Sequence, residues 1–214
     1  DVYKRQAMVL RRLRPVPLGD DRVLFGAESL WYYSRRLVDL RPDVFLPESI
    51  LRFRGRPIDL SRILLWAYPG IGIPDQCANY WLRNAFILKS KYGGDPRRIA
   101  EEHRYDARGI LNALKNFYGI GDKLAHFITR VMYSMGYWRI KDPEDVDIPA
   151  DVHLQKLAFR TGMVKVSTTR VILGTNDVME VVKKAYRTAT KAIKVPPMDL
   201  DEPAWHIGRW CCSR

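Results

Sequence analysis

Cysteine is scarce in this chain: Cys77, Cys211 and Cys212 are the three cysteines among 214 residues. Three cysteines are too few for a disulfide scaffold, which excludes the small, disulfide-rich secreted class. The sequence also lacks an apolar run of the roughly 18 residues that cross a bilayer, and it lacks the apolar region of a signal peptide. These absences favour a cytoplasmic protein with no membrane partner.

Acidic residues are the second deficit. The chain has 36 Lys and Arg against 24 Asp and Glu, which gives a formal net charge of +12. Such an excess favours a polyanionic partner, because each phosphate that a Lys or Arg neutralises releases condensed counterions. Charge alone therefore indicates nucleic acid, and a basic surface without a specific partner is the alternative.

Sustained alternation of apolar and polar residues is absent, so the sequence predicts an all-α protein. Apolar residues at helical spacing, with proline or a capping residue before them and glycine after them, mark the helices. The segment 137–150 is expected to be a polar connection, and Trp205 and Trp210 are expected to pack the C-terminal tail onto the body. Helices are predicted at 27–40, 45–55, 59–70, 73–94, from 95, 106–117, 121–136, 152–162 and 176–193, the last with Thr175 or Asn176 as its cap.

Both chain ends are unusual. The first six residues, DVYKRQ, resemble a sequencing-adapter remnant, and residues 1–25 predict an irregular lead-in with at most a short strand. At the other end, Cys211 and Cys212 form a pair that is seldom useful unless further ligands follow. We therefore expect a fragment that is cut short at both ends.

The stretch FYGIGDKLAHF contains the first candidate site. Gly119, Ile120 and Gly121 lie between two predicted helices, in a hairpin at 117–122, and glycine lets a backbone approach another molecule closely. The start of the second helix suits a phosphate, because its first N–H groups carry partial positive charge. A plain turn between helices is the alternative.

Lys123 follows within the first turn of that helix. The helix dipole disfavours a cation there, and a neutral amine is what a Schiff-base nucleophile needs. The alternative is an exposed lysine that contacts DNA phosphate. Asp151 directly precedes the predicted helix 152–162, so it is a candidate N-cap, and a carboxylate fixed in this way can also act in catalysis.

These residues resemble the motifs of the helix-hairpin-helix DNA glycosylase superfamily, which includes endonuclease III and the 8-oxoguanine glycosylases. GIGDKLA is similar to its hairpin, with Lys123 on the catalytic lysine, and ADVHL places Asp151 and His153 on the catalytic aspartate and the histidine. The resemblance covers roughly residues 60–214. It implies a two-lobed helical fold over 26–205, a base-binding cleft between the lobes, and the superfamily's base-excision repair.

The resemblance also implies cofactors and contacts. HIGRWCCSR is similar to the opening of the iron–sulfur loop of endonuclease III, so residues 206–214 would begin a truncated loop with Cys212 as the first ligand of a [4Fe–4S] cluster. A K⁺ or Na⁺ ion is expected at the hairpin. The expected DNA contacts are Gly119, Ile120, Gly121, Lys123, His153 and Gln76. Gln76 on the helix 73–94 would probe the flipped base, and an ordinary polar helix residue is its alternative.

Three departures from the family pattern stand out. Asp151 follows Lys123 by 28 residues, longer than is usual in endonuclease III, so the connection 136–150 is expected to contain an insertion. The hairpin begins with Phe117-Tyr118 where the family has Leu-Pro, and Ala150 stands in place of a valine. These departures bear on which subfamily the chain resembles more than on the chemistry that the resemblance implies.

Two functions of different classes follow. The first is a monomeric DNA glycosylase and abasic-site lyase that removes an oxidised base from damaged duplex DNA through a Schiff base on Lys123, in the cytoplasm or at the nucleoid. The second is a helix-hairpin-helix module that binds DNA without cutting it. The presence of both Lys123 and Asp151 favours the enzyme, because a binding module needs neither residue. An RNA-binding or structural helical domain is a third, weaker reading.

Overall fold

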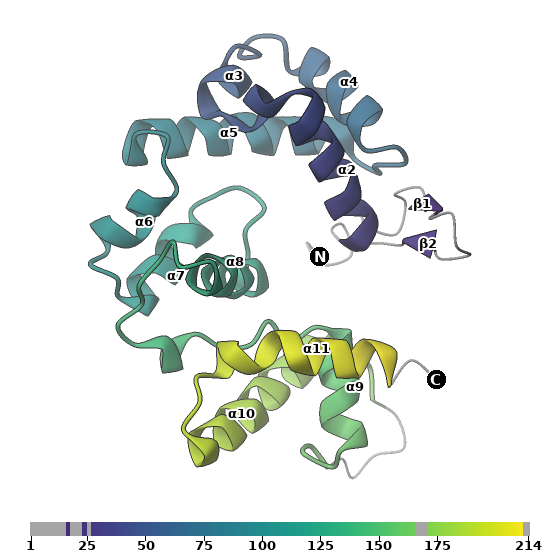
Figure 1. Ribbon diagram of the computed structural model, residues 1–214, viewed down its shortest axis with the longest axis vertical. Coiled ribbons are helices and arrows are strands. Elements are labelled where there is room, and N and C mark those ends of the chain that lie inside the picture. The colour runs from purple at the N-terminus through teal and green to yellow at the C-terminus, as the bar shows by residue number, and fades with distance from the viewer. Residues whose placement is uncertain (1–15, 18–22, 25–26, 166–170, 212–214) are drawn as a thin grey trace. The chain divides into compact units, whose positions relative to one another are not determined.

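The computed structural model describes residues 16–17, 23–24, 27–165 and 171–211. The chain divides into two units, one made of Asp1–Arg98 with Phe117–Gly119, the other of Ile99–Asn116 with Ile120–Arg214. Nearly all of the described secondary structure is helical, which confirms the all-α prediction (Figure 1). Among the described residues, the strands form one antiparallel pair, in which β1 (Val16–Pro17) pairs with β2 (Val23–Leu24).

The first unit is built on its longest helix. Helices α3 and α4 both pack against α5 (Figure 1). Each of these three helices begins with proline, which has no N–H to leave unpaired at a helix start. Helix α5 ends at Gly93 in the left-handed conformation, with a φ of 65°. The helices of this unit are α2 (Ala27–Leu40), η1 (Pro42–Phe45), α3 (Pro47–Leu51), α4 (Pro57–Ala67) and α5 (Pro74–Tyr92).

The second unit contains α7 and α8, the two helices that flank the hairpin, and the C-terminal helices. Helix α9 packs against both α10 and α11 around an apolar core that includes Leu154, Val182 and Ala204 (Figure 1). Helix α7 packs against α8. The remaining helices are α6 (Arg97–Glu102), α7 (Ala107–Lys115), α8 (Asp122–Ser134), η2 (Pro143–Asp145), α9 (Val152–Arg160), α10 (Asn176–Ile193), η3 (Pro197–Leu200) and α11 (Asp201–Trp210).

Helix positions follow the sequence predictions closely, and three details differ. Of the four apolar residues at helical spacing in α2, Tyr33 and Leu37 are buried, while Leu30 and Leu40 are exposed. Thr175 occupies the N-cap of α10, but its hydroxyl donates to the carbonyl of Ile172 and does not cap the helix. The helix predicted at 45–55 is shorter in the structure, because the 3₁₀ helix η1 ends at Phe45 and α3 covers only Pro47–Leu51.

The segment 137–150 is a connection between α8 and α9, as predicted, but its apolar residues are buried and it is not simply polar. Trp138 is 2% exposed, and Val146 and Ile148 are buried as well. The segment docks on α7, since Asp142 accepts a hydrogen bond from the backbone N–H of Ala107 at 2.8 Å and Arg108 donates to Asp145 at 2.9 Å. The charged residues of the segment thus bind it to α7, while its apolar residues are buried in the interior. The segment ends directly before Asp151.

The C-terminal tail forms the helix α11, which the sequence reading left unassigned. Residues 206–210 belong to this helix, so a loop can begin only after Trp210. Trp210 is 64% exposed, and the expected packing of that ring is therefore wrong. Cys212 lies outside the described residues, as do the first fifteen residues of the chain.

Candidate active site

The hairpin has the geometry that its two glycines predict. Gly119 has a φ of 79°, in the left-handed region, and Gly121 is the N-cap of α8 with φ −92° and ψ −174°. Glycine offers no side chain to cap the helix, and a Cβ added at Gly121 would meet nothing within 4 Å. The start of α8 is therefore open to a ligand at Gly121.

Helix α5 holds the first half of the hairpin. The side-chain amide of Asn84 donates to the carbonyl of Tyr118 at 3.0 Å and accepts from its backbone N–H at 2.7 Å. Arg83 stacks on the Tyr118 ring, 4.6 Å from its centroid. Sequence reasoning missed Asn84. The signal was Tyr118 itself, since a residue with an N–H stands where the family has proline and that N–H needs a partner.

Asp151 is fixed through both of its oxygens. Its Oδ1 accepts from the backbone N–H groups of His153 at 2.9 Å and Leu154 at 3.0 Å, which confirms the N-cap prediction for α9. Its Oδ2 accepts from Nε1 of Trp205 in α11 at 2.9 Å. Three N–H donors therefore set the direction of one carboxylate, and the contribution of Trp205 was not visible in the sequence.

Lys123 and Asp151 act on the same buried carboxyl, that of Asp201. Asp201 is 3% exposed, with Oδ2 lying 2.7 Å from Nε of Arg130. Burial raises the pKa of Asp201 to about 6; the charge of Asp151 adds to this rise, while those of Arg130 and Lys123 oppose it. Both site residues lie in the second unit, and the charge of each acts on Asp201.

This part of the chain matches a known family. Residues 123–213 match the model of a family described as AGOG, N-glycosylase/DNA lyase, and this range begins at Lys123 and includes Asp151 and Asp201. Among solved structures, the chain is similar to a trapped endonuclease III–DNA covalent intermediate, an estranged-adenine complex, with a TM-score of 0.50 and 15% identity. That similarity covers 97% of this chain and 72% of the other.

The chain matches the N-glycosylase/DNA lyase family over residues 123–213, and its fold resembles that of endonuclease III. It is an enzyme of the DNA glycosylase/lyase class, and its helical fold is the one that the helix-hairpin-helix DNA glycosylase superfamily shares. None of the curated proteins compared with it matches.

Two further predicted site residues of this glycosylase have partners in its fold. His153 is half-buried, with its ring edge-on to Trp205 at 5.6 Å, and burial lowers the pKa of its imidazole. Gln76 lies on α5 in the first unit, where its amide donates to the hydroxyl of Tyr80 at 3.1 Å. Ile120, between the two glycines, is half-buried and opens the second stretch of the second unit.

Metal ligands are sparse in the part of this glycosylase that the structure describes. Cys77 is half-buried and Cys211 exposed, and both are free thiols. Among the described residues no group of three or more His, Cys, Asp or Glu side chains could hold a metal ion. Likewise, no helix in the described ranges is long and apolar enough to cross a bilayer.

Proposed function

We propose that this glycosylase removes an oxidised base from duplex DNA and then cleaves the strand, with Lys123 as the nucleophile and Asp151 as its carboxylate partner. The observation that carries the proposal is the Asp151 carboxylate, which three N–H donors fix at the start of α9 in the same unit as Lys123. A plain hairpin that binds DNA phosphate has no need of a carboxylate held by three N–H donors.

The chemistry follows from these roles. The damaged nucleotide leaves the base stack, because its glycosidic bond cannot be reached inside the duplex. The neutral amine of Lys123 attacks C1′, the glycosidic bond breaks, and the base departs with the bonding electrons and takes up a proton. The sugar ring then opens to a Schiff base. Loss of a proton from C2′ and cleavage of the bond between C3′ and its phosphate oxygen nick the strand.

Asp151 suits the stabilisation of positive charge on the sugar. Backbone N–H groups of α9 and the Trp205 indole fix both of its oxygens, so the carboxylate does not have to reorganise as charge develops at C1′. A base of this kind can also receive the proton that Lys123 loses on attack. In either role, its direction matters as much as its charge.

In this proposal, the hairpin binds the DNA backbone. The open start of α8 at Gly121 would accept a phosphate near the lesion, directly or through a K⁺ or Na⁺ ion, with Gly119, Ile120 and Lys123 around it. His153 and Gln76 complete the proposed DNA contacts. The partner is damaged duplex DNA, the enzyme acts as a monomer, and its place is the cytoplasm or the nucleoid.

The [4Fe–4S] cluster remains a separate proposal, with Cys212 as its first ligand. The described residues do not provide a ligand set on their own, so the cluster would need Cys212, which lies outside them, and further ligands. Such a cluster would fold a basic loop against DNA, and no step of the reaction above depends on it.

Borohydride trapping tests the function. The protein is incubated with a duplex that carries an abasic site or 8-oxoguanine, reduced, and compared with Lys123→Gln and Asp151→Asn. We expect a covalent adduct in the wild type, none in Lys123→Gln, and adduct formation about 10²–10⁴-fold slower in Asp151→Asn. A folded wild-type protein that binds the duplex and gives no adduct would identify a non-catalytic binding module instead.

A further inference from the structure

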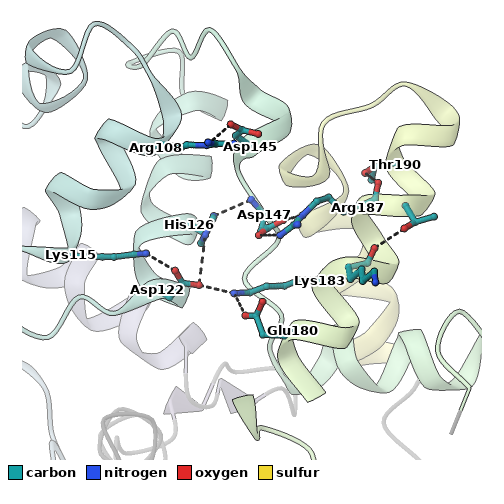
Figure 2. A network of polar contacts seen from close by, with 12 residues as sticks. Arg108, Lys115, Asp122, His126, Asp145, Asp147, Glu180, Lys183, Arg187 and Thr190 are labelled. Carbon is teal, nitrogen blue, oxygen red and sulfur yellow. Dashed lines mark hydrogen bonds and ion pairs between the residues drawn. The ribbon is translucent and has the colours of Figure 1, made fainter. Parts of the chain in front are cut away.

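A buried histidine in α8 lies between two segments that lead to the site residues. His126 is 5% exposed. Its Nδ1 accepts a hydrogen bond from the backbone N–H of Asp147 at 3.0 Å, and its Nε2 lies 3.7 Å from Oδ2 of Asp122 (Figure 2). Burial lowers the pKa of this imidazole, and the accepting Nδ1 places the proton of the neutral ring on Nε2.

The two partners of the ring are close in sequence to the two reactive residues. Asp122 directly precedes Lys123, and Asp147 stands four residues before Asp151. His126 therefore connects the first turn of α8 with the segment that ends at the N-cap of α9. Within the second unit, this ring joins the chain that carries the lysine to the chain that carries the carboxylate.

Each partner is in turn fixed by cations from other helices. Lys115 at the end of α7 lies 2.7 Å from Oδ1 of Asp122, and Lys183 of α10 donates to its Oδ2 at 2.6 Å (Figure 2). Burial acts to raise the pKa of Asp122, but the hydrogen bonds from these lysines hold it well below its ordinary value. Asp122 is therefore a fixed anion at the start of the helix.

Arg187 secures the other partner. Its Nε donates to Oδ1 of Asp147 at 2.6 Å and its second nitrogen to Oδ2 at 2.5 Å, a bidentate geometry that fixes the carboxylate in its plane. Lys183 and Arg187 lie one turn apart, so the same face of α10 holds both carboxylates (Figure 2). Lys183 is 6% exposed and also donates to Glu180 at 2.9 Å.

Burying the charge of Lys183 costs desolvation free energy unless the ammonium group is fully paired. An ion pair at the surface would give similar stability without that desolvation cost. The buried charges therefore suit a network that fixes geometry. We propose that His126 is a positioning residue, which holds the start of α8 and the segment 147–150 in the register that aims Lys123 and Asp151 at the same sugar carbon. This inference rests on the proposed function of those two residues.

Single-turnover trapping on a duplex with an abasic site, at saturating DNA, tests the proposal in the full chain. The variants are His126→Ala, His126→Asn and His126→Gln. Asn places an oxygen near the position of Nδ1 and can accept from Asp147, whereas Gln reaches only toward Asp122. We expect the rate of His126→Ala to fall about tenfold or more with unchanged DNA affinity, because small misplacements of reacting groups are costly. Asn should recover most of the rate and Gln little.

If His126→Ala does not fold, the same network can be tested by comparing Lys183→Met with Lys184→Met, because Lys183 donates to Asp122. Lys184 is the exposed neighbour on α10, so this pair matches the change in charge and size. The proposal expects a slower rate at saturating DNA for Lys183→Met alone. Wild-type rates in His126→Ala, or an Asn variant no faster than the Gln variant, would overturn it. So would a parallel loss of rate and affinity, which is the mark of partial unfolding.

The protonation of the ring provides a readout that needs no catalysis. Nitrogen NMR of the imidazole is expected to show the form with the proton on Nε2, and a proton on Nδ1 would overturn the arrangement itself. If the wild type forms no adduct while the ring has the expected form, the proposed function fails and not the geometry of the network. If adducts form and the ring has the other form, the inference fails alone.

Discussion

At the scale of single residues, the two hairpin glycines differ in what an added methyl group would meet. A Cβ at Gly119 would lie 2.9 Å from Cδ2 and 3.1 Å from Cε2 of the Tyr80 ring, in a backbone conformation with φ 79°. At Gly121 the φ is −92°, which any residue adopts, and the space around the new atom is empty. The first glycine is thus required by the fold and the second only by whatever approaches it.

The matched pair Gly119→Ala and Gly121→Ala separates these requirements. We expect Gly119→Ala to lower the thermal midpoint, because the left-handed conformation costs an alanine roughly 1–2 kcal/mol and the contact with Tyr80 adds to it. Gly121→Ala should keep the wild-type midpoint and bind duplex DNA about tenfold more weakly, since its methyl group would occupy the space of a phosphate. Calorimetry and fluorescence anisotropy measure the two effects. Full DNA affinity in Gly121→Ala would contradict a phosphate site there.

At the scale of elements, α11 approaches α9 more closely than a side chain at one position allows. A Cβ on Gly208 would lie 2.4 Å from the carbonyl oxygen and 2.8 Å from the carbonyl carbon of His153. These are backbone atoms, so a helix must move to admit the methyl group. Because α11 also presents Trp205 to Asp151, the same movement would release one oxygen of that carboxylate.

Gly208→Ala is therefore expected to destabilise the protein by about 1–3 kcal/mol, the cost of forcing extra volume into a packed interface. Helix propensity acts in the opposite direction, since alanine is favoured over glycine by about 1 kcal/mol inside a helix. Urea denaturation followed by circular dichroism gives the difference, and Gly121→Ala is the control for a glycine with open space. A stability equal to or above that of the wild type would show that α11 can shift without cost.

Elements were predictable from the sequence where the cause is local. The starts of α4 and α5 are marked by proline, the end of α5 by Gly93, and the start of α9 by the cap at Asp151. The connection 137–150 reads as polar because its charges are frequent, but a sequence cannot show that Asp142 and Asp145 anchor it to α7. Helix α11 was missed because η3 precedes it and no side chain caps its start.

The candidate site also has a part with local sequence signals and a part that depends on long-range contacts. Lys123 and Asp151 follow from motifs a few residues long. Their surroundings come from distant parts of the chain: Trp205 is 54 residues from Asp151, and Arg130 is 71 residues from Asp201. No sequence motif with a fixed spacing relates the two residues of either pair, so one sequence alone does not predict these contacts. The charge partners of a site become visible only when the helices are packed.

At the scale of the whole molecule, the buried Asp201 makes stability depend on pH. Its pKa is raised to about 6 in the folded protein, mainly by burial, against an ordinary value of 3.8. Between these two values the folded state holds a proton on Asp201 that the unfolded state has released. Folding therefore takes up protons in this window, and the contribution of Asp201 to stability falls as the pH rises from about 4 to about 6.

Asp201→Asn should remove this contribution. We expect the free energy of unfolding of the wild type, relative to that of the variant, to fall by about 2 kcal/mol between pH 4 and pH 7, since each pKa unit is worth about 1.4 kcal/mol. Urea titrations at successive pH values measure the two curves. The exposed Asp199, two residues earlier, provides the control Asp199→Asn, whose curve should follow the wild type.

Other buried groups do not disturb this comparison. Burial lowers the pKa of His126, so the unfolded state binds more protons there, and stability from this ring is lost as the pH falls below about 6.5. That slope is opposite in sign and common to the wild type and both variants, so it cancels in the difference. Parallel curves for the wild type and Asp201→Asn would mean that Asp201 is ionised throughout, with Arg130 compensating its burial in full.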